Sequence, residues 1–273
     1  MQLVQLQRAQ QKFKDQGIGI TAISYDSPDI LREFAQRQQI TFPLLADPTS
    51  GIIRRFHVLN REAKGMTAGM AHPGFLYVDR TGHIQETFFE SAYTDRYTAN
   101  NVIAKLFPEL TQEIERNVNA PHISLKLEQS DDVGMPGSRV SLIAEVELAK
   151  NLHVYAPGVT GYKPIELRLD LPSEIKANPA VYPTPRILFL PAIKERVPVF
   201  EGRFRIVQDV TVKADRDFVK SLGSGKLIAI RGDLKYQACD EKICYVPASV
   251  PASWELQVLP LDLKRSPDLI QHR

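Results

Sequence analysis

The stretch Lys235-Tyr236-Gln237-Ala238-Cys239-Asp240-Glu241-Lys242-Ile243-Cys244-Tyr245-Val246-Pro247 holds both cysteines of this 273-residue chain. The two cysteines enclose four residues, between a strand-like segment that ends at Ala238 and a proline-containing return. Residues that face each other across a tight hairpin have Cα atoms about 4.5–5.5 Å apart, a separation that a disulfide accepts. We therefore predict a Cys239–Cys244 disulfide that joins the two ends of a β-hairpin turn.

The residues alone leave the role of this bond open. A ring this small adds about 2 kcal/mol of stability by the loop-closure argument, which favours an exchangeable redox bond over a structural one. A structural disulfide or a pair of inert thiols is the competing interpretation. A zinc site needs four ligands, and the chain has no second cysteine pair and no histidines at ligand spacing. We predict neither a metal nor a cofactor.

Apolar and polar residues alternate through most of the chain beyond residue 120, where 14 of the 19 prolines also lie. The pattern predicts an antiparallel, immunoglobulin-like β-sandwich over residues 121–262, joined to the first half by a linker at residues 117–121. The alternating positions are Ile123, Leu125 and Leu127; Val140, Leu142, Ala144 and Val146; Ile165, Leu167, Leu169 and Leu171; Leu227, Ala229 and, after a slip near Gly232, Leu234 and Tyr236; and Trp254, Leu256 and Val258.

The cysteine stretch, together with His153-Val154-Tyr155-Ala156-Pro157 and Val250-Pro251, resembles the N-terminal periplasmic domain family of the disulfide reductase DsbD. That family is immunoglobulin-like and has a Tyr-Gln-x-Cys … Cys-Tyr-x-Pro segment. The resemblance covers about residues 121–260. Two departures stand out: the cysteines enclose four residues where five are typical, and the family's aromatic cap over the disulfide, which should fall within Tyr182–Pro191, has no certain counterpart.

The resemblance implies an electron relay with thioredoxin-like or other redox proteins as partners. The family's domain receives electrons as a dithiol and passes them to a substrate disulfide. Because Asp240 and Glu241 disfavour a thiolate nearby, we expect Cys239 and Cys244 to act mainly as an acceptor disulfide that a partner's thiolate attacks. We expect the tyrosines to pack around the pair, either as a shield or as ordinary sheet aromatics. They are Tyr155, Tyr236 and Tyr245.

The first half of the chain alternates helix-like and strand-like segments. The predicted elements are a helix at 2–16 that ends at Gly17, a strand at 18–24, a helix capped by Ser27 and Pro28, an extended piece at 42–45, a short helix from Asp47-Pro48 to Phe56, a hairpin of 74–78 with 84–89, and a helix at 99–106. This order is that of the α/β thioredoxin fold without its first strand, in a domain at residues 1–117.

Residues 72–84, His72-Pro73-Gly74-Phe75-Leu76-Tyr77-Val78-Asp79-Arg80-Thr81-Gly82-His83-Ile84, resemble the peroxiredoxin-like (AhpC/TSA, redoxin) branch of the thioredoxin fold. The resemblance covers about residues 1–107. It implies that Pro73 is cis and begins a strand that faces a now vestigial active site.

The family's first strand and reactive-cysteine loop have no counterpart here, since residues 1–238 contain no cysteine. This half is therefore catalytically empty as written. Either the true start lies upstream or the domain is a retired scaffold. We favour the first, because Leu3, Leu6 and Phe13 keep a core-facing pattern, and we predict that the codons upstream of Met1 encode a strand and a reactive-cysteine loop.

Composition excludes several classes of protein. Hydrophobic residues make up 43% and charged residues 24%, as in an ordered globular protein. The 34 Lys and Arg against 32 Asp and Glu leave a net charge of +2, without the basic excess that nucleic-acid binding needs. No apolar run is long enough to span a membrane, and the N-terminus has no signal-peptide core. The compartment stays open, although the second resemblance favours a bacterial periplasm.

Two functions are compatible with the sequence. One is a thiol–disulfide oxidoreductase that relays electrons through Cys239 and Cys244. The alternative is an immunoglobulin-like binding module with a structural disulfide, attached to a thioredoxin-like scaffold. A reduction potential well below about −300 mV would mark a structural bond, and a higher one would mark a redox centre.

Overall fold

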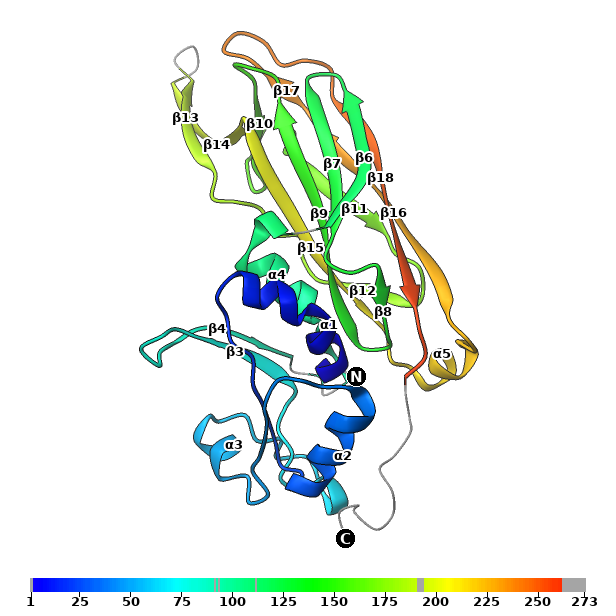
Figure 1. The fold of residues 1–273 in the computed structure, drawn as a ribbon. Coiled ribbons are helices and arrows are strands. Elements are labelled where there is room, and N and C mark those ends of the chain that lie inside the picture. Colours follow the sequence, from blue (N-terminus) through cyan, green and yellow to red (C-terminus); the bar gives the residue numbers. More distant parts are fainter. Residues whose placement is uncertain (1, 91, 93, 111, 191–193, 262–273) are drawn as a thin grey trace. The chain divides into compact units, whose positions relative to one another are not determined.

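The computed structural model describes residues 2–90, 92, 94–110, 112–190 and 194–261 (Figure 1). Its internal contacts divide the chain into two compact units, with a boundary between Leu106 and Phe107. Each unit is described by itself. Among the described residues, no helix has the length and apolar character needed to cross a membrane.

The first unit alternates helices and strands, as the sequence predicts. Its elements are α1 (Gln2–Asp15), β1 (Ala22–Ser24), α2 (Pro28–Gln38), β2 (Leu44–Ala46), α3 (Gly51–Arg55), the 3-10 helix η1 (Gly65–Thr67), β3 (Gly74–Val78), β4 (Ile84–Phe89), β5 (Arg96–Tyr97) and α4 (Ala99–Leu106).

Short-range hydrogen bonds set the ends of these helices. The Ser27 hydroxyl accepts from the Ile30 N–H at the start of α2, in the usual N-cap arrangement. The buried Asp47 carboxylate accepts from the N–H groups of Gly51 and Ile53 and so begins α3. Gly17 has φ +71°, the left-handed conformation that ends α1. The predicted caps and stops are confirmed.

The strands of the first unit form two separate pairs. β1 and β2 are parallel, and β3 and β4 form the predicted antiparallel hairpin. Among the described residues, no ladder joins the two pairs. The strand predicted at 18–24 is shorter, at Ala22–Ser24, because it follows only the three residues of β2 with which it pairs.

The prediction of a cis Pro73 is wrong. The described chain contains no cis peptide bond, so the His72–Pro73 bond is trans. Trans is the lower-energy isomer of an X–Pro bond by about 0.5–1 kcal/mol, and a cis bond persists only where the surrounding structure holds it. Pro73 still immediately precedes β3, as predicted.

The second unit is built of strands. Its elements are the 3-10 helix η2 (Pro108–Leu110), β6 (Gln112–Ala120), β7 (Ile123–Gln129), β8 (Val133–Gly134), β9 (Ser138–Leu148), β10 (His153–Tyr155), β11 (Glu166–Asp170), β12 (Ile175–Ala177), β13 (Arg186–Leu190), β14 (Glu195–Glu201), β15 (Arg203–Val212), α5 (Arg216–Ser221), β16 (Lys226–Tyr236), β17 (Ala238–Cys239) and β18 (Ala248–Val258).

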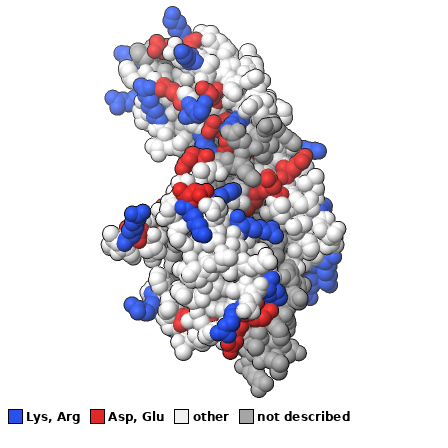
Figure 2. All heavy atoms as spheres, in the orientation of Figure 1, with Lys and Arg blue, Asp and Glu red and all other residues white. Residues whose placement is uncertain are grey.

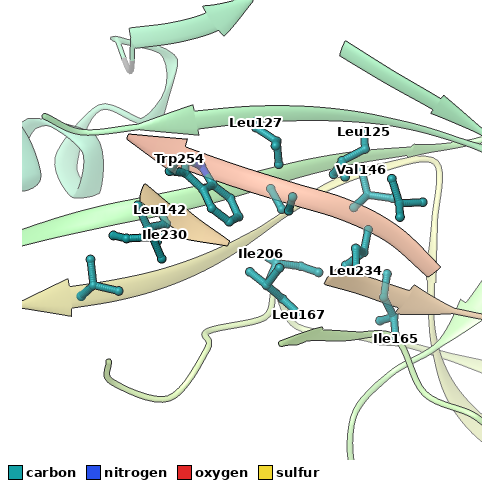
Figure 3. Close-up of a cluster of buried hydrophobic side chains, with 14 of the residues drawn as sticks. Leu125, Leu127, Leu142, Val146, Ile165, Leu167, Ile206, Ile230, Leu234 and Trp254 are labelled. Atoms are coloured by element: carbon teal, nitrogen blue, oxygen red, sulfur yellow. The ribbon is translucent and has the colours of Figure 1, made fainter. Parts of the chain in front are cut away.

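Two sheets of this unit enclose the main core, as in an immunoglobulin-like sandwich. One has the order β12-β15-β9-β7-β6 and the other β11-β16-β18-β8. Trp254 is 1% exposed and lies among aliphatic side chains of both sheets (Figure 3). A third sheet, β13-β14-β10-β17, turns one face to the same core. The predicted alternation in β7, β9 and β18 is confirmed.

The predicted inward face of β16 is partly wrong. The strand pairs with β18 without a slip over its whole length, and the even-numbered positions from Ile228 to Tyr236 are buried. Leu227 is 58% exposed instead of facing the core. Gly232 lies where a side chain cannot fit, because a Cβ there would come within 2.1 Å of the Arg168 carbonyl oxygen on β11. Because glycine adds no apolar side chain, Gly232 interrupts the hydrophobic alternation of β16. The sequence therefore predicts a register slip there that the strand does not have.

Residues 117–120, for which the sequence predicts a linker, lie in β6 and pair with β7. The cause is visible in the side chains: Val118 and Ala120 pack against the main core, while Asn117 and Asn119 are exposed. Because two of these four residues are asparagines, the segment has the composition of a linker although it forms a strand at the edge of its sheet.

Charged groups of both signs are interspersed on the surface. On the face shown in Figure 2, Lys and Arg side chains lie next to Asp and Glu side chains, as the net charge of +2 leads one to expect. Several form ion pairs within the second unit, such as Arg203 with Glu147 at 2.9 Å. Exposed pairs of this kind contribute little to stability.

Candidate redox site

The third sheet places the cysteines on the face opposite the main core. Val154 of β10 and Ala238 of β17 point into the main core. Their chain neighbours Tyr155 and Cys239 point the other way, since side chains alternate along a strand. There they form a small cluster with Val197 and Val199 of β14. We call this cluster the site face.

Cys239 and Cys244 are joined by a disulfide, with Sγ atoms 2.05 Å and Cα atoms 4.0 Å apart. The Asp240 N–H donates to the Ile243 carbonyl, and the Tyr245 N–H donates to the Ala238 carbonyl, both at 2.9 Å. These bonds close a tight antiparallel turn whose ends are the two cysteines. The predicted disulfide at a hairpin turn is confirmed.

The two halves of the disulfide are unequally accessible. Cys239 lies on β17, opposite β10, and is 1% exposed. Cys244 lies on the outer arm of the turn and is exposed, as are Ile243 at 56% and Val246 at 87%. Cys244 is therefore the exposed cysteine of the pair, and Cys239 is the buried one.

Asp240 organises the turn between the cysteines. One carboxylate oxygen accepts from the N–H groups of Lys242 at 2.7 Å and Ile243 at 2.8 Å, and the other accepts from the Tyr245 hydroxyl at 3.1 Å. These bonds, the one from Ile243 first, hold the pKa of Asp240 below its usual value. Asp240 thus shapes the backbone of the turn in addition to placing a negative charge beside the sulfurs.

We expect Asp240→Ala to loosen the turn. The Lys242 and Ile243 amides lose their acceptor, so their hydrogen exchange at neutral pH should become several-fold faster, while Asp240→Asn, which keeps an oxygen there, should stay near the wild type. The depressed pKa adds a pH dependence: the carboxylate's contribution is present above its unfolded pKa and is lost as the pH falls through the folded pKa. Unchanged exchange in Asp240→Ala would contradict this role.

Tyr155 is the predicted aromatic that contacts the disulfide. Its hydroxyl oxygen is 3.9 Å from Cys244 Sγ, and its ring stacks on that of Tyr162 with centroids 4.2 Å apart. The Tyr162 hydroxyl donates to Glu195 at 2.6 Å, and this bond raises the pKa of Tyr162 to about 12. Burial raises the pKa of Tyr155 as well. Both phenols stay protonated at neutral pH, so Tyr155 can donate a hydrogen bond to a sulfur.

The structure does not bring the other two predicted tyrosines to the sulfurs. Tyr236 is buried in the main core, and its hydroxyl donates to the Pro121 carbonyl at 2.6 Å. Tyr245 supports the turn through Asp240 and stacks on His122 with ring centroids 4.1 Å apart. Their role at the pair, like that of Pro73 in the first unit, stays a prediction.

The segment Tyr182–Pro191, in which an aromatic cap was expected, contributes aliphatic side chains to the site face. Tyr182 packs against the main core, and Phe189 is 52% exposed on β13. The residues of this segment that pack on the site face are Leu188 and Leu190. The tip of this hairpin, at 191–193, lies outside the described residues.

Sequence reasoning missed Tyr162, Glu195 and His153. Tyr162 and Glu195 lie far from the cysteines in the chain and carry no motif. His153 is 4% exposed on β10, and burial lowers its pKa despite the opposing charges of Glu201 and Asp240. The alternation of the His153-Val154-Tyr155 segment could have placed His153 on the same face as Tyr155. Among the described residues, no group of His, Cys, Asp or Glu is arranged to hold a metal.

Comparison with known proteins gives two family matches. Residues 1–87 match the AhpC/TSA family, and residues 124–251 match the N-terminal domain family of the thiol:disulfide interchange protein DsbD. No curated protein matches the sequence significantly.

Among solved structures, the N-terminal periplasmic domain of ScsB from Proteus mirabilis is similar at 14% identity and a TM-score of 0.34, covering 55% of this chain and 53% of that one. The chain thus spans about half the length of that structure. The reduced N-terminal domain of DsbD from Neisseria meningitidis is similar at 12% identity and a TM-score of 0.30, covering 44% of this chain and 82% of that one. The chain thus combines a region at residues 1–87 that is similar to the thioredoxin-like AhpC/TSA family with a region at residues 124–251 that is similar to the immunoglobulin-like DsbD N-terminal domain family.

Proposed function

We propose that the second unit carries out thiol–disulfide exchange through Cys239 and Cys244, relaying electrons from a thioredoxin-like partner to a substrate disulfide. The observation that carries the proposal is the asymmetry of the bond, in which an exposed Cys244 is joined to a Cys239 that is 1% exposed. Structural disulfides gain nothing from an accessible sulfur, whereas exchange depends on access to the sulfur that is attacked.

The exchange has two steps. A partner thiolate attacks Cys244 Sγ in line with the disulfide, a new bond joins the partner to Cys244, and the electron pair of the broken bond goes to Cys239 Sγ. The partner's second thiolate then attacks the partner sulfur that is bonded to Cys244. This releases Cys244 and leaves the partner with a disulfide of its own. Two electrons have moved to the pair, while the protons of the partner's thiols pass through solvent, and the reduced Cys244 can pass the electrons on by the reverse reaction with a substrate disulfide.

Tyr155 and the turn assist this reaction by position. The Tyr155 hydroxyl, 3.9 Å from Cys244 Sγ, can donate to the negative charge that develops on that sulfur as the partner leaves. The exposed Ile243 and Val246 on either side of Cys244 offer an apolar rim against which a partner can pack. The first unit has no cysteine in this sequence and takes no part in these steps.

We further propose a periplasmic location, because the ScsB domain to which this chain is similar is described as periplasmic and the matched DsbD family acts in disulfide interchange. An oxidising compartment is also where such a disulfide forms and persists.

Trapping tests the proposal. We expect the oxidised chain to form a mixed disulfide with a thioredoxin whose resolving cysteine is replaced by serine, and peptide mass spectrometry should place the bond on Cys244. The Cys244→Ser variant has no disulfide for that thiolate to attack, so it is the negative control and should give no adduct. An oxidised chain that gives no adduct while folded, but reacts once denatured, would show a structural disulfide and favour the binding-module alternative.

A further inference from the structure

A buried histidine lies beside the disulfide on the site face. His153 of β10 is directly opposite Cys239 of β17 in the antiparallel register, and it is 4% exposed. Directly opposed residues of an antiparallel pair project from the same face, with Cβ atoms about 4.5–5.5 Å apart. The imidazole and the Cys239 side chain are therefore neighbours.

The His153 Nε2 atom is buried, and among the residues that the structure describes none forms a hydrogen bond with it. Its surroundings explain why. The ring meets that of Tyr155 edge-on at 5.5 Å, Glu201 is engaged by Arg186 at 2.5 Å, and Asp240 is engaged by the turn. A buried polar atom without a partner costs free energy, and each such atom in a folded protein calls for an explanation.

We propose that His153 is a positioning residue whose Nε2–H hydrogen-bonds the Cys239 sulfur once the disulfide is opened. This inference rests on the proposed exchange reaction. A disulfide sulfur is a weak acceptor, whereas the thiolate that leaves when Cys244 is attacked is a strong one. The hydrogen bond thus forms mainly in the reduced state and stabilises a charge that burial would otherwise disfavour.

The proton balance is simple. His153 is uncharged at neutral pH, because burial lowers its pKa, and Glu201 and Asp240 oppose that shift without reversing it. The imidazole donates a hydrogen bond through its N–H and keeps the proton. The two electrons come from the partner's dithiol, whose two protons pass to solvent; Cys244 takes up one proton, and Cys239 stays a thiolate that the His153 N–H stabilises.

The reduction potential of the pair tests the role of His153, measured by equilibration with glutathione so that no partner protein is needed. We expect His153→Phe, which keeps a ring but has no N–H, to lower the equilibrium constant for reduction about five- to tenfold, which corresponds to about 20–30 mV. His153→Gln keeps a donor and should retain most of the wild-type value. His83→Asn, which changes an exposed histidine of the first unit, should leave the potential unchanged.

A second readout uses the unaltered chain. The imidazole 15N chemical shifts of His153 should change when the disulfide is reduced, since Nε2 gains a partner. Equal potentials in the wild type and in a folded His153→Phe, or shifts that stay the same on reduction, would overturn the proposal. Failure of the exchange function itself would show differently, as a lack of partner adducts together with a potential in the structural range.

Discussion

Replacing Cys244 by alanine should abolish thiol–disulfide exchange by this chain completely. The chain has only two cysteines, and the one that remains is 1% exposed on β17. No thiol of a partner can then bond to it without local opening of the sheet. The measurement is the rate at which the single thiol displaces thionitrobenzoate from a thioredoxin whose one remaining cysteine carries that group, a reaction that forms a mixed disulfide and releases the thionitrobenzoate thiolate. A Cys244→Ala variant that displaces thionitrobenzoate as fast as Cys239→Ala does would contradict the assignment of the attacked sulfur.

Cys239→Ala separates the two sulfurs. It leaves the exposed Cys244 as a single thiol, which can still attack the thionitrobenzoate-activated thioredoxin and form a mixed disulfide, but no neighbouring sulfur is left to release the partner. We expect stable adducts with thioredoxin and no turnover, whereas the Cys244→Ala variant should form no adduct. Adducts of equal yield in both variants would show that the two cysteines are equally accessible.

Trp254→Ala should give the largest loss of stability in the second unit. The indole is 1% exposed in the main core, and its N–H donates to the Glu128 carbonyl at 2.9 Å. Removing a buried tryptophan costs about 3–5 kcal/mol, because it opens a cavity and leaves the carbonyl without its partner. The measurement is the free energy of unfolding in denaturant.

Leu227→Ala is the matched control on the neighbouring strand β16. Leu227 is 58% exposed, so the free energy of unfolding should change by less than about 0.5 kcal/mol. Equal losses in Trp254→Ala and Leu227→Ala would contradict the assignment of the inward face of β16 and β18. Because β16 leads into the turn that carries the cysteines, Trp254→Ala should also make Cys239 easier to label with a thiol reagent after reduction.

The sandwich was largely predictable because its strands are half-buried. Val140, Leu142, Ala144 and Val146 occupy every second position of β9 and lie in the main core, as the period of a strand requires. The same alternation gave a wrong inward face for the first part of β16. Gly232 faces inward because the backbone of β11 passes too close for a side chain, and the hydrophobic pattern does not reveal this contact. β6 was not predicted, because it lies at the edge of its sheet and its exposed asparagines are typical of a linker.

The site was predictable only as far as its motif reaches. Cys239, Cys244 and Asp240 are close in sequence, so their turn follows from local spacing. Glu195 of β14 and His153 of β10 come to the site through the order β13-β14-β10-β17, which is set by long-range pairing, and Tyr162 comes to it by stacking on Tyr155. Tyr236 shows the converse, because its closeness in sequence to Cys239 does not place it near the sulfur. Pro73 was assigned from resemblance alone, and its cis form is wrong.

The reduction potential of the Cys239–Cys244 pair tests the central claim most directly. It can be measured by equilibrating the folded chain with glutathione mixtures and counting free thiols by mass spectrometry after alkylation. The account predicts a potential above about −300 mV, in the range of disulfides that exchange with redox partners. A value well below about −300 mV would mark a structural bond and contradict the claim that this pair relays electrons.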